Sequence, residues 1–203
     1  LLLNREKNWA DTFFVSGVWG NSVTPPVQWS NYDSSDPIDD VETAKTAILQ
    51  GTGREGNTLV LGYQAMVKLR NHPLIIDRIK YVGGGAVAGA TESVLAQVFG
   101  VDRVLVPRAI RNSNVEGKSS ASLAFVHGKH ALLVHTPKVA SLTTPAAGLI
   151  FSWQPEAAFA GSAIGLRRMC MEHRLSDRIE ASLSYDLKIV GADLGYMLPS
   201  CVA

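Results

Sequence analysis

The segment Asp36–Gly62, DPIDDVETAKTAILQGTGREGNTLVLG, contains the start and end signals of a helix followed by those of a strand. Asp36 is a good N-cap, Pro37 suits the first helical position, and the acidic residues after it favour the positive end of the helix dipole. A glycine-rich stretch ends the helix, and Thr58–Leu61 is a short apolar run typical of a strand. The segment therefore predicts a helix directly before a strand.

Further helices and strands are predicted on both sides of this segment. Helices are expected at residues 1–14, 62–71, 74–81 and 91–100, and short strands at 103–106 and 131–134. From Ile179 to Ile189 apolar and polar residues alternate strictly, which predicts strand structure with a buried face and a wet face. Because eleven residues exceed the usual five or six of a strand, either a turn interrupts the stretch or it is one extended sheet element. Because no regular βαβα rhythm and no internal repeat is present, the predicted fold class is α+β.

Loops of low charge separate these elements. Residues 15–35 are rich in Gly, Pro, Ser and Asn and carry Trp19 and Trp29. Exposed tryptophans on so long a loop are unfavourable in an isolated monomer, so we expect this loop to be docked. A mobile loop is predicted at Gly83–Ala90 and another uncharged loop at Ser141–Ala147.

Composition excludes several classes of protein. The chain has 203 residues with 19 Lys and Arg against 18 Asp and Glu, a net charge of +1. This balance excludes a dedicated nucleic-acid binder, and a hydrophobic content of 46% excludes an acidic disordered chain. Charged residues make up 18%, below the roughly 25% usual for soluble domains. We therefore expect other subunits to cover part of the surface.

Cysteine usage and the ends of the chain add further expectations. Cys170 and Cys201 form no C-x-x-C motif, so two reduced thiols are expected rather than a disulfide scaffold or a zinc ribbon. Leu1–Leu3 is too short for a signal peptide, and glycines and prolines interrupt the longest uncharged stretch, at residues 12–32. The first residue is Leu rather than Met, so we expect the natural N-terminus to be missing.

The segment Gly51–Gly56 matches the G-x-G-x-x-G motif of dinucleotide-binding proteins. That motif places pyrophosphate at the N-terminus of a helix that follows a strand. Here a predicted helix precedes the motif and a predicted strand follows it, and Glu55 would place a carboxylate against the phosphates. We therefore interpret the segment as a turn that ends a helix.

Three histidines lie close together in the sequence: His127, His130 and His135. Their spacing fits no zinc motif, and no carboxylate lies between them. A strand at 131–134 would also direct His130 and His135 to opposite faces. We expect all three at the surface or at an interface.

Nucleophile motifs are equally weak. Ser162, in Gly161–Gly165, lacks the spacing of a nucleophile elbow. Cys170 has His173 nearby but stands between two methionines, which favours a buried, inert thiol. No paired carboxylates stand out, so we assign no catalytic, cofactor-binding or metal-binding residues.

Four basic residues near the C-terminus could form a patch: Arg167, Arg168, Arg174 and Lys188. With a net charge of +1, salt bridges are the expected role, including salt bridges across a subunit contact. Weak local contact with nucleic acid stays open as an alternative.

Several segments together resemble a known family. They are NTLVLG (57–62), LRNHP (69–73), DRIKY (77–81), LAQVFGVDRVLV (95–106), HGKHALL (127–133), DRIE (177–180) and ADLGY (192–196). In this order and spacing they resemble the major capsid proteins of tailed bacteriophages and prophages.

This resemblance implies an α+β fold of the Hong Kong 97 type, shared with encapsulin shells and the herpesvirus capsid floor. Residues 1–36 would hold the end of the spine helix and a loop of the peripheral domain. Residues 37–165 would be mainly the axial domain, and residues 166–203 would return to the peripheral domain as strands. The N-terminal arm and the extended loop would precede Leu1 and be absent, so the fold would be truncated at its N-terminus.

The implied function is structural and not enzymatic, with no cofactor. Copies of the chain would assemble into pentamers and hexamers of an icosahedral shell around double-stranded DNA, which would be touched weakly on the inner face. Portal, scaffold or head protease would be assembly partners, and no membrane would be involved. The location would be the virion capsid, assembled in the bacterial host cytoplasm.

Two alternatives remain open. One is an encapsulin-like protein nanocompartment, and the other is a nucleotide-binding enzyme that uses Gly51–Gly56. For residues 1–203 alone we expect monomers or weak small oligomers, because the segments that bind neighbouring subunits would be missing.

Overall fold

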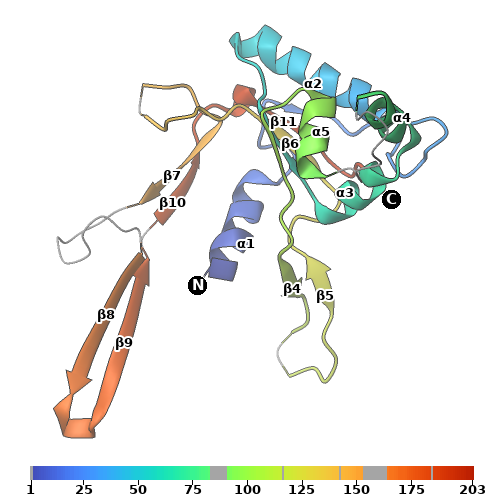
Figure 1. Cartoon of the computed structure of the whole chain (residues 1–203). Helices are drawn as coiled ribbons and strands as arrows, with labels where there is room; N and C mark the ends of the chain where they lie inside the picture. The colour runs from blue at the N-terminus through green and yellow to red at the C-terminus, as the bar shows by residue number, and fades with distance from the viewer. Residues whose placement is uncertain (1, 83–90, 116, 142, 153–163, 184) are drawn as a thin grey trace.

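The computed structural model describes residues 2–82, 91–115, 117–141, 143–152, 164–183 and 185–203, and its centre is a five-stranded sheet (Figure 1). In spatial order its strands are β1 (Asn21–Ser22), β11 (Gly195–Leu198), β6 (Ala131–Val134), β2 (Thr58–Leu61) and β3 (Arg103–Leu105). β1 is parallel to β11 and β3 is parallel to β2, while β6 is antiparallel to both of its neighbours. The sheet therefore joins segments from near both ends of the chain.

Five α-helices accompany the sheet in the described residues. They are α1 (Leu2–Phe13), α2 (Pro37–Thr52), α3 (Tyr63–Arg70), α4 (Pro73–Val82) and α5 (Glu92–Phe99). Asp36 caps α2 as predicted, accepting hydrogen bonds from the backbone of Ile38 at 3.0 Å and Asp39 at 3.1 Å. Gly53 ends α2 in the left-handed conformation, with φ of 67°. No helix in the described ranges is long and apolar enough to cross a membrane.

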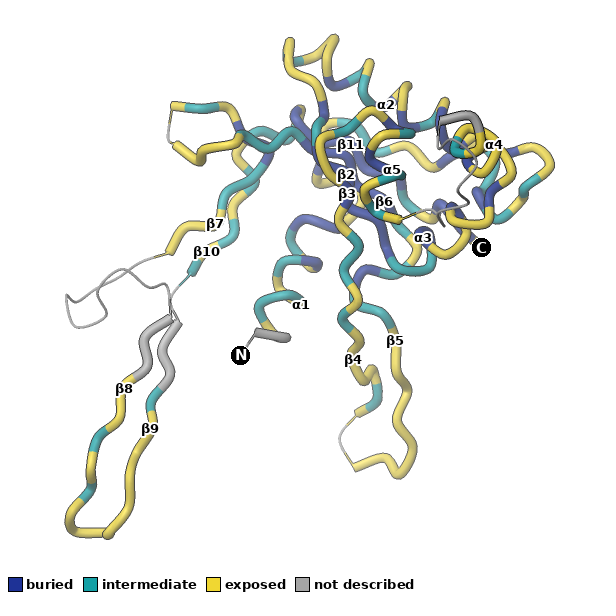
Figure 2. The backbone as a smooth tube through the Cα atoms, viewed as in Figure 1, coloured by how far each residue is buried: buried dark blue, intermediate teal, exposed yellow. Residues whose placement is uncertain are grey.

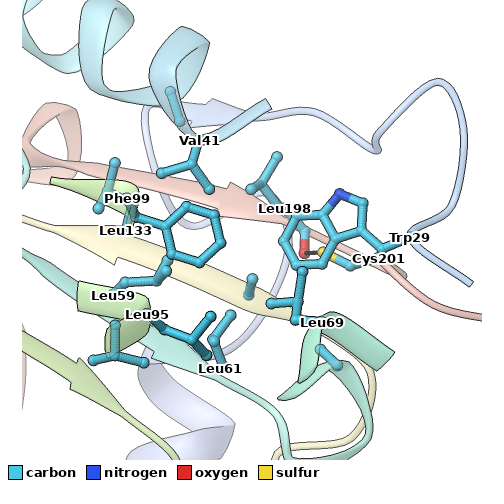
Figure 3. Packing of buried hydrophobic residues seen from close by; sticks show 14 of the residues in the cluster. Trp29, Val41, Leu59, Leu61, Leu69, Leu95, Phe99, Leu133, Leu198 and Cys201 are labelled. Atoms are coloured by element: carbon cyan, nitrogen blue, oxygen red, sulfur yellow. Dashed lines mark hydrogen bonds between the residues drawn. The ribbon is translucent and has the colours of Figure 1, made fainter. Parts of the chain in front are cut away.

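The pleat of the central strands divides the core into two clusters. All residues of β2, β6 and β11 are buried, and alternate side chains face opposite sides of the sheet. Leu59 and Leu133 belong to one cluster, which Figure 3 shows meeting side chains from α2 and α5. Val60 and Leu132 belong to the other cluster, which contains Phe13 of α1. The sheet is therefore covered on both faces.

The loop at residues 15–35 is docked, as predicted, on the core of its own chain. Trp19 and Trp29 are both buried. The indole of Trp29 donates to Asp40 Oδ2 at 2.7 Å, and the indole of Trp19 donates to the Phe13 carbonyl at 2.7 Å. Each tryptophan thus buries its ring and still satisfies its N–H.

The central sheet, with the helices and the loop packed on it, forms the body of the molecule. Three further strand pairs extend away from this body. They are β4 (Ile110–Asn112) with β5 (Leu123–Phe125), β7 (Gly148–Ser152) with β10 (Tyr185–Ile189), and β8 (Ile164–Met171) with β9 (Ser176–Leu183). Figure 1 shows β8–β9 continuing outward beyond β7–β10, and β4–β5 projecting on the other side of α1. In Figure 2 burial is concentrated in the body, whereas β4–β5 and much of the described β8–β9 hairpin are exposed.

Of the two alternatives predicted for the alternating stretch Ile179–Ile189, the structure shows the interrupted one. The stretch is divided between β9 and β10, which pair with different strands. Burial alternates in β10, but Ile179 in β9 is 73% exposed. The prediction of one buried face is therefore wrong for this part of β9, because the hairpin extends away from the body that would cover it.

The predicted division at residues 36 and 165 stays a prediction. The structure adds that β11, near the C-terminus, lies in the same sheet as β2 and β6. Residues 166–203, the last of the three predicted parts, therefore contribute a strand to the central sheet as well as strands to the projecting hairpin. The predicted loop at Gly83–Ala90 lies outside the described residues.

Candidate assembly surfaces

The G-x-G-x-x-G segment has the element order expected for a turn. α2 precedes it and β2 follows it, so no helix opens at the glycines. At Gly56 an added Cβ would overlap the side chain of Leu133 in the core. Close packing accounts for this glycine, and the end of α2 accounts for Gly53.

His127 is buried, so its expected position at the surface or an interface is wrong for the chain as described. Its ring lies 5.5 Å from that of Trp9 and 5.3 Å from that of Phe14. Neither ring nitrogen has a hydrogen-bond partner among the described residues, and the Glu6 carboxylate lies 3.9 Å from Nδ1. Burial lowers the pKa of His127 to about 4, which keeps the imidazole neutral at pH 7.

The other two histidines make separate contacts. His130 Nδ1 accepts a hydrogen bond from the backbone of Ser200 at 2.9 Å. His135 Nδ1 lies 2.8 Å from the carbonyl oxygen of Glu55. In the part of the chain that the structure describes, no group of three or more His, Cys, Asp or Glu residues could hold a metal ion.

The two cysteines occupy opposite environments. Cys170 is exposed on β8, so the prediction that it is buried is wrong. The methionines that suggested packing are its neighbours on a hairpin strand, where they provide no core. Cys201 is buried in the body, and burial raises the pKa of its thiol. Ser162 lies outside the described residues.

Two of the four basic residues form salt bridges within their own strand pair. Arg168 pairs with Asp177 across the β8–β9 ladder, and Lys188 lies 3.5 Å from Asp186 on β10. The predicted salt-bridge role is confirmed for these two residues, inside one chain. The side chains of both ion pairs are exposed to solvent, so these pairs add little to stability.

The projecting hairpins carry exposed apolar side chains. On β4–β5 these are Ile110 and Leu123, and on the β8–β9 hairpin they are Leu175 and Ile179. An isolated two-stranded hairpin is marginally stable in water, and its outer edges offer unpaired backbone groups. Such hairpins become more stable when another surface covers their apolar side chains and pairs with their edges.

Two grooves run beside α1, one toward each projecting arm. The first, of about 300 Å³, is mostly apolar and lies between α1 and the β7–β10 pair. Its lining is Arg5, Glu6, Trp9, Ile150 and Leu187. The second, of about 510 Å³, lies between α1 and β4 and includes the basic residues Lys7 and Arg111. Grooves and projecting hairpins are thus the surface features that the described residues present.

Comparison with known proteins gives these surfaces a context. The chain is 28% identical over 170 residues to the major capsid protein of Burkholderia phage BcepMu, covering 81% of this chain and 50% of that protein. The chain resembles a phage major capsid protein. The family resemblance stated from the sequence is thereby confirmed. No protein-family model matches the chain.

Solved structures share the fold. A phage-related protein from Bordetella bronchiseptica superposes with a TM-score of 0.81 at 23% identity, covering 98% of this chain and 63% of that chain. A structure from Mycobacterium phage Che8 gives a TM-score of 0.53 at 13% identity, covering 99% and 60% respectively. The mixed helix-and-strand fold class is confirmed. The chain spans about half the length of the curated capsid protein that it matches.

Proposed function

We propose that the chain is part of the structural head protein of a tailed phage or prophage. The observation that carries the proposal is the similarity to the BcepMu major capsid protein along 81% of the chain. Exposed hairpins and open grooves support it, because a shell subunit meets neighbours along several edges. Copies assemble into pentamers and hexamers of an icosahedral shell that encloses double-stranded DNA.

In this proposal the fold is of the Hong Kong 97 type. α1 is the end of the spine helix, residues 37–165 are mainly axial domain, and residues 166–203 return in part to the peripheral domain. Portal, scaffold or head protease act during assembly in the bacterial cytoplasm, and the finished shell is the virion capsid. The net charge of +1 suits weak contact with DNA on the inner face.

The test is to express the complete reading frame that contains residues 1–203 and to examine the product by electron microscopy and light scattering. Rings or closed shells are expected, and shells from phage-producing cells should contain nuclease-protected DNA. A chain that stays monomeric at every concentration would contradict the proposal. Shells that contain an enzyme instead of DNA would favour the encapsulin-like alternative.

A further inference from the structure

The tip of the β8–β9 hairpin presents an apolar side chain in an unusual conformation. The turn is formed by η2 (Glu172–Arg174) and Leu175, which is 97% exposed. Leu175 has φ of 46° and ψ of 43°, in the left-handed region that glycine and asparagine adopt most easily. A leucine at this position neither eases formation of the turn nor packs on the body. Its presence is explained if its side chain binds another surface.

The apolar groove between α1 and the β7–β10 pair has the matching character. Trp9, Ile150 and Leu187 supply its apolar lining, and Ile150 is 44% exposed. Arg5 and Glu6 of α1 stand at the same groove. A groove of about 300 Å³ has room for a leucine side chain and part of the turn that carries it.

The charges at the tip complement the charges at the groove. Glu172 and Arg174 precede Leu175 in the same turn and are exposed, and among the described residues neither belongs to an ion pair. Glu172 can therefore meet Arg5 while Arg174 meets Glu6. Complementary charges around an apolar anchor are typical of specific protein contacts.

The tip cannot reach the groove of its own chain. β8 and β9 are each eight residues long and form a continuous antiparallel ladder, which places the turn about 25 Å beyond the base of the hairpin. The residues that line the groove come from α1, β7 and β10. In Figure 1 the β8–β9 hairpin extends from the end of β7–β10 away from α1. The occupant must come from another molecule.

We propose that the β8–β9 tip of one copy inserts Leu175 into the groove between α1 and β7–β10 of a second copy. The contact is head-to-tail, because it joins two different surfaces, and such contacts generate rings when the rotation closes. The inference rests on the proposed function, since it names one of the contacts by which shell subunits hold each other.

Cysteine cross-linking tests the contact directly. In the complete reading frame with Cys170→Ser, one preparation carries Leu175→Cys and another carries Ile150→Cys. The two are mixed, allowed to assemble and mildly oxidised. A disulfide-linked pair of copies is expected only in the mixture. The matched control replaces Leu175→Cys by Val139→Cys, whose side chain is 74% exposed but lies outside the hairpin.

The outcomes separate this contact from the proposed function. Shells that form with no more cross-linking than the Val139→Cys control would overturn the contact and leave the shell function standing. Cross-linked pairs without rings or shells would support the contact and count against the shell function. Neither shells nor cross-links would count against both.

Substitution of the anchor gives a second, independent readout. Leu175→Gly relieves the left-handed backbone, so the thermal stability of the unassembled chain should be equal or higher. Assembly should fall about tenfold, the size expected when an interface loses an apolar anchor. Val139→Gly is the control for loss of an exposed apolar residue. Normal assembly of Leu175→Gly would overturn the proposal.

Discussion

His127 places a neutral imidazole against the rings of Trp9 and Phe14. Its pKa is about 4 in the folded chain against 6.5 for an ordinary histidine, so between these values the unfolded chain binds more protons. The contribution of neutral His127 to the free energy of unfolding is therefore fully present above pH 6.5 and is lost as the pH falls toward 4. The full loss is about 3 kcal/mol, and attraction to the Glu6 carboxylate would reduce it.

The variant that tests this effect is His127→Phe, which keeps an aromatic ring but cannot be protonated. We expect its free energy of unfolding to fall less than that of the wild type between pH 7.5 and pH 4.5, as measured by urea denaturation. Burial also lowers the pKa of His72 and His130, so part of the slope should remain in both proteins. Equal slopes would contradict the assignment to His127.

The residue scale also shows which contacts sequence reasoning can find. The cap at Asp36 was predictable because the backbone groups that it binds lie two and three residues away. The burial of His127 was not, because Trp9 and Phe14 come from a segment more than a hundred residues earlier in the chain. The residues next to His127 in the sequence do not indicate that contact.

At the scale of elements, one glycine marks a tight approach of two backbones. Gly62 donates its backbone N–H to the His130 carbonyl at 2.9 Å between β2 and α3. A Cβ on Gly62 would overlap the backbone carbonyl of Gly128, which cannot yield as a flexible side chain could. Gly62→Ala should therefore lower the free energy of unfolding by about 2–3 kcal/mol.

Gly51 is the matched control for this substitution. It lies in the last turn of α2, and an added Cβ would meet nothing within 4 Å. Gly51→Ala should raise the free energy of unfolding by up to about 1 kcal/mol, because alanine favours a helix. Chemical denaturation of both variants measures the difference, and similar effects at the two positions would contradict the packing around Gly62.

Helices and strands were predictable where the residues that determine them are neighbours in the sequence. β2 and β6 are short apolar runs bounded by turns, and both were placed correctly. The alternation at Ile179–Ile189 left open whether one extended strand or two would form, because alternation reports which way side chains point, not which strand each residue pairs with. The division of this stretch between β9 and β10 depends on partners β8 and β7, which lie earlier in the chain.

At the scale of the whole molecule, the chain combines a compact body with arms that have little packing of their own. The body holds both core clusters on the two faces of the central sheet. The arms expose apolar side chains, and Figure 2 marks most of the described residues of β4–β5 and β8–β9 as exposed. This contrast agrees with the low charged fraction of 18%, from which coverage by other subunits was expected.

The contrast predicts a two-part pattern of amide hydrogen exchange. In the unassembled chain, β2, β6 and β11 should exchange slowly, because their hydrogen bonds break only when the buried sheet opens. The β8–β9 ladder should exchange quickly, because a two-stranded hairpin opens without disturbing the body. In shells of the complete protein, exchange in β8–β9 should slow by about tenfold or more as neighbouring copies cover it. Mass spectrometry of peptides from free and assembled protein measures both states. Fast exchange in β8–β9 of intact shells would mean that this arm stays free, and the contacts that hold the shell would then lie on the body.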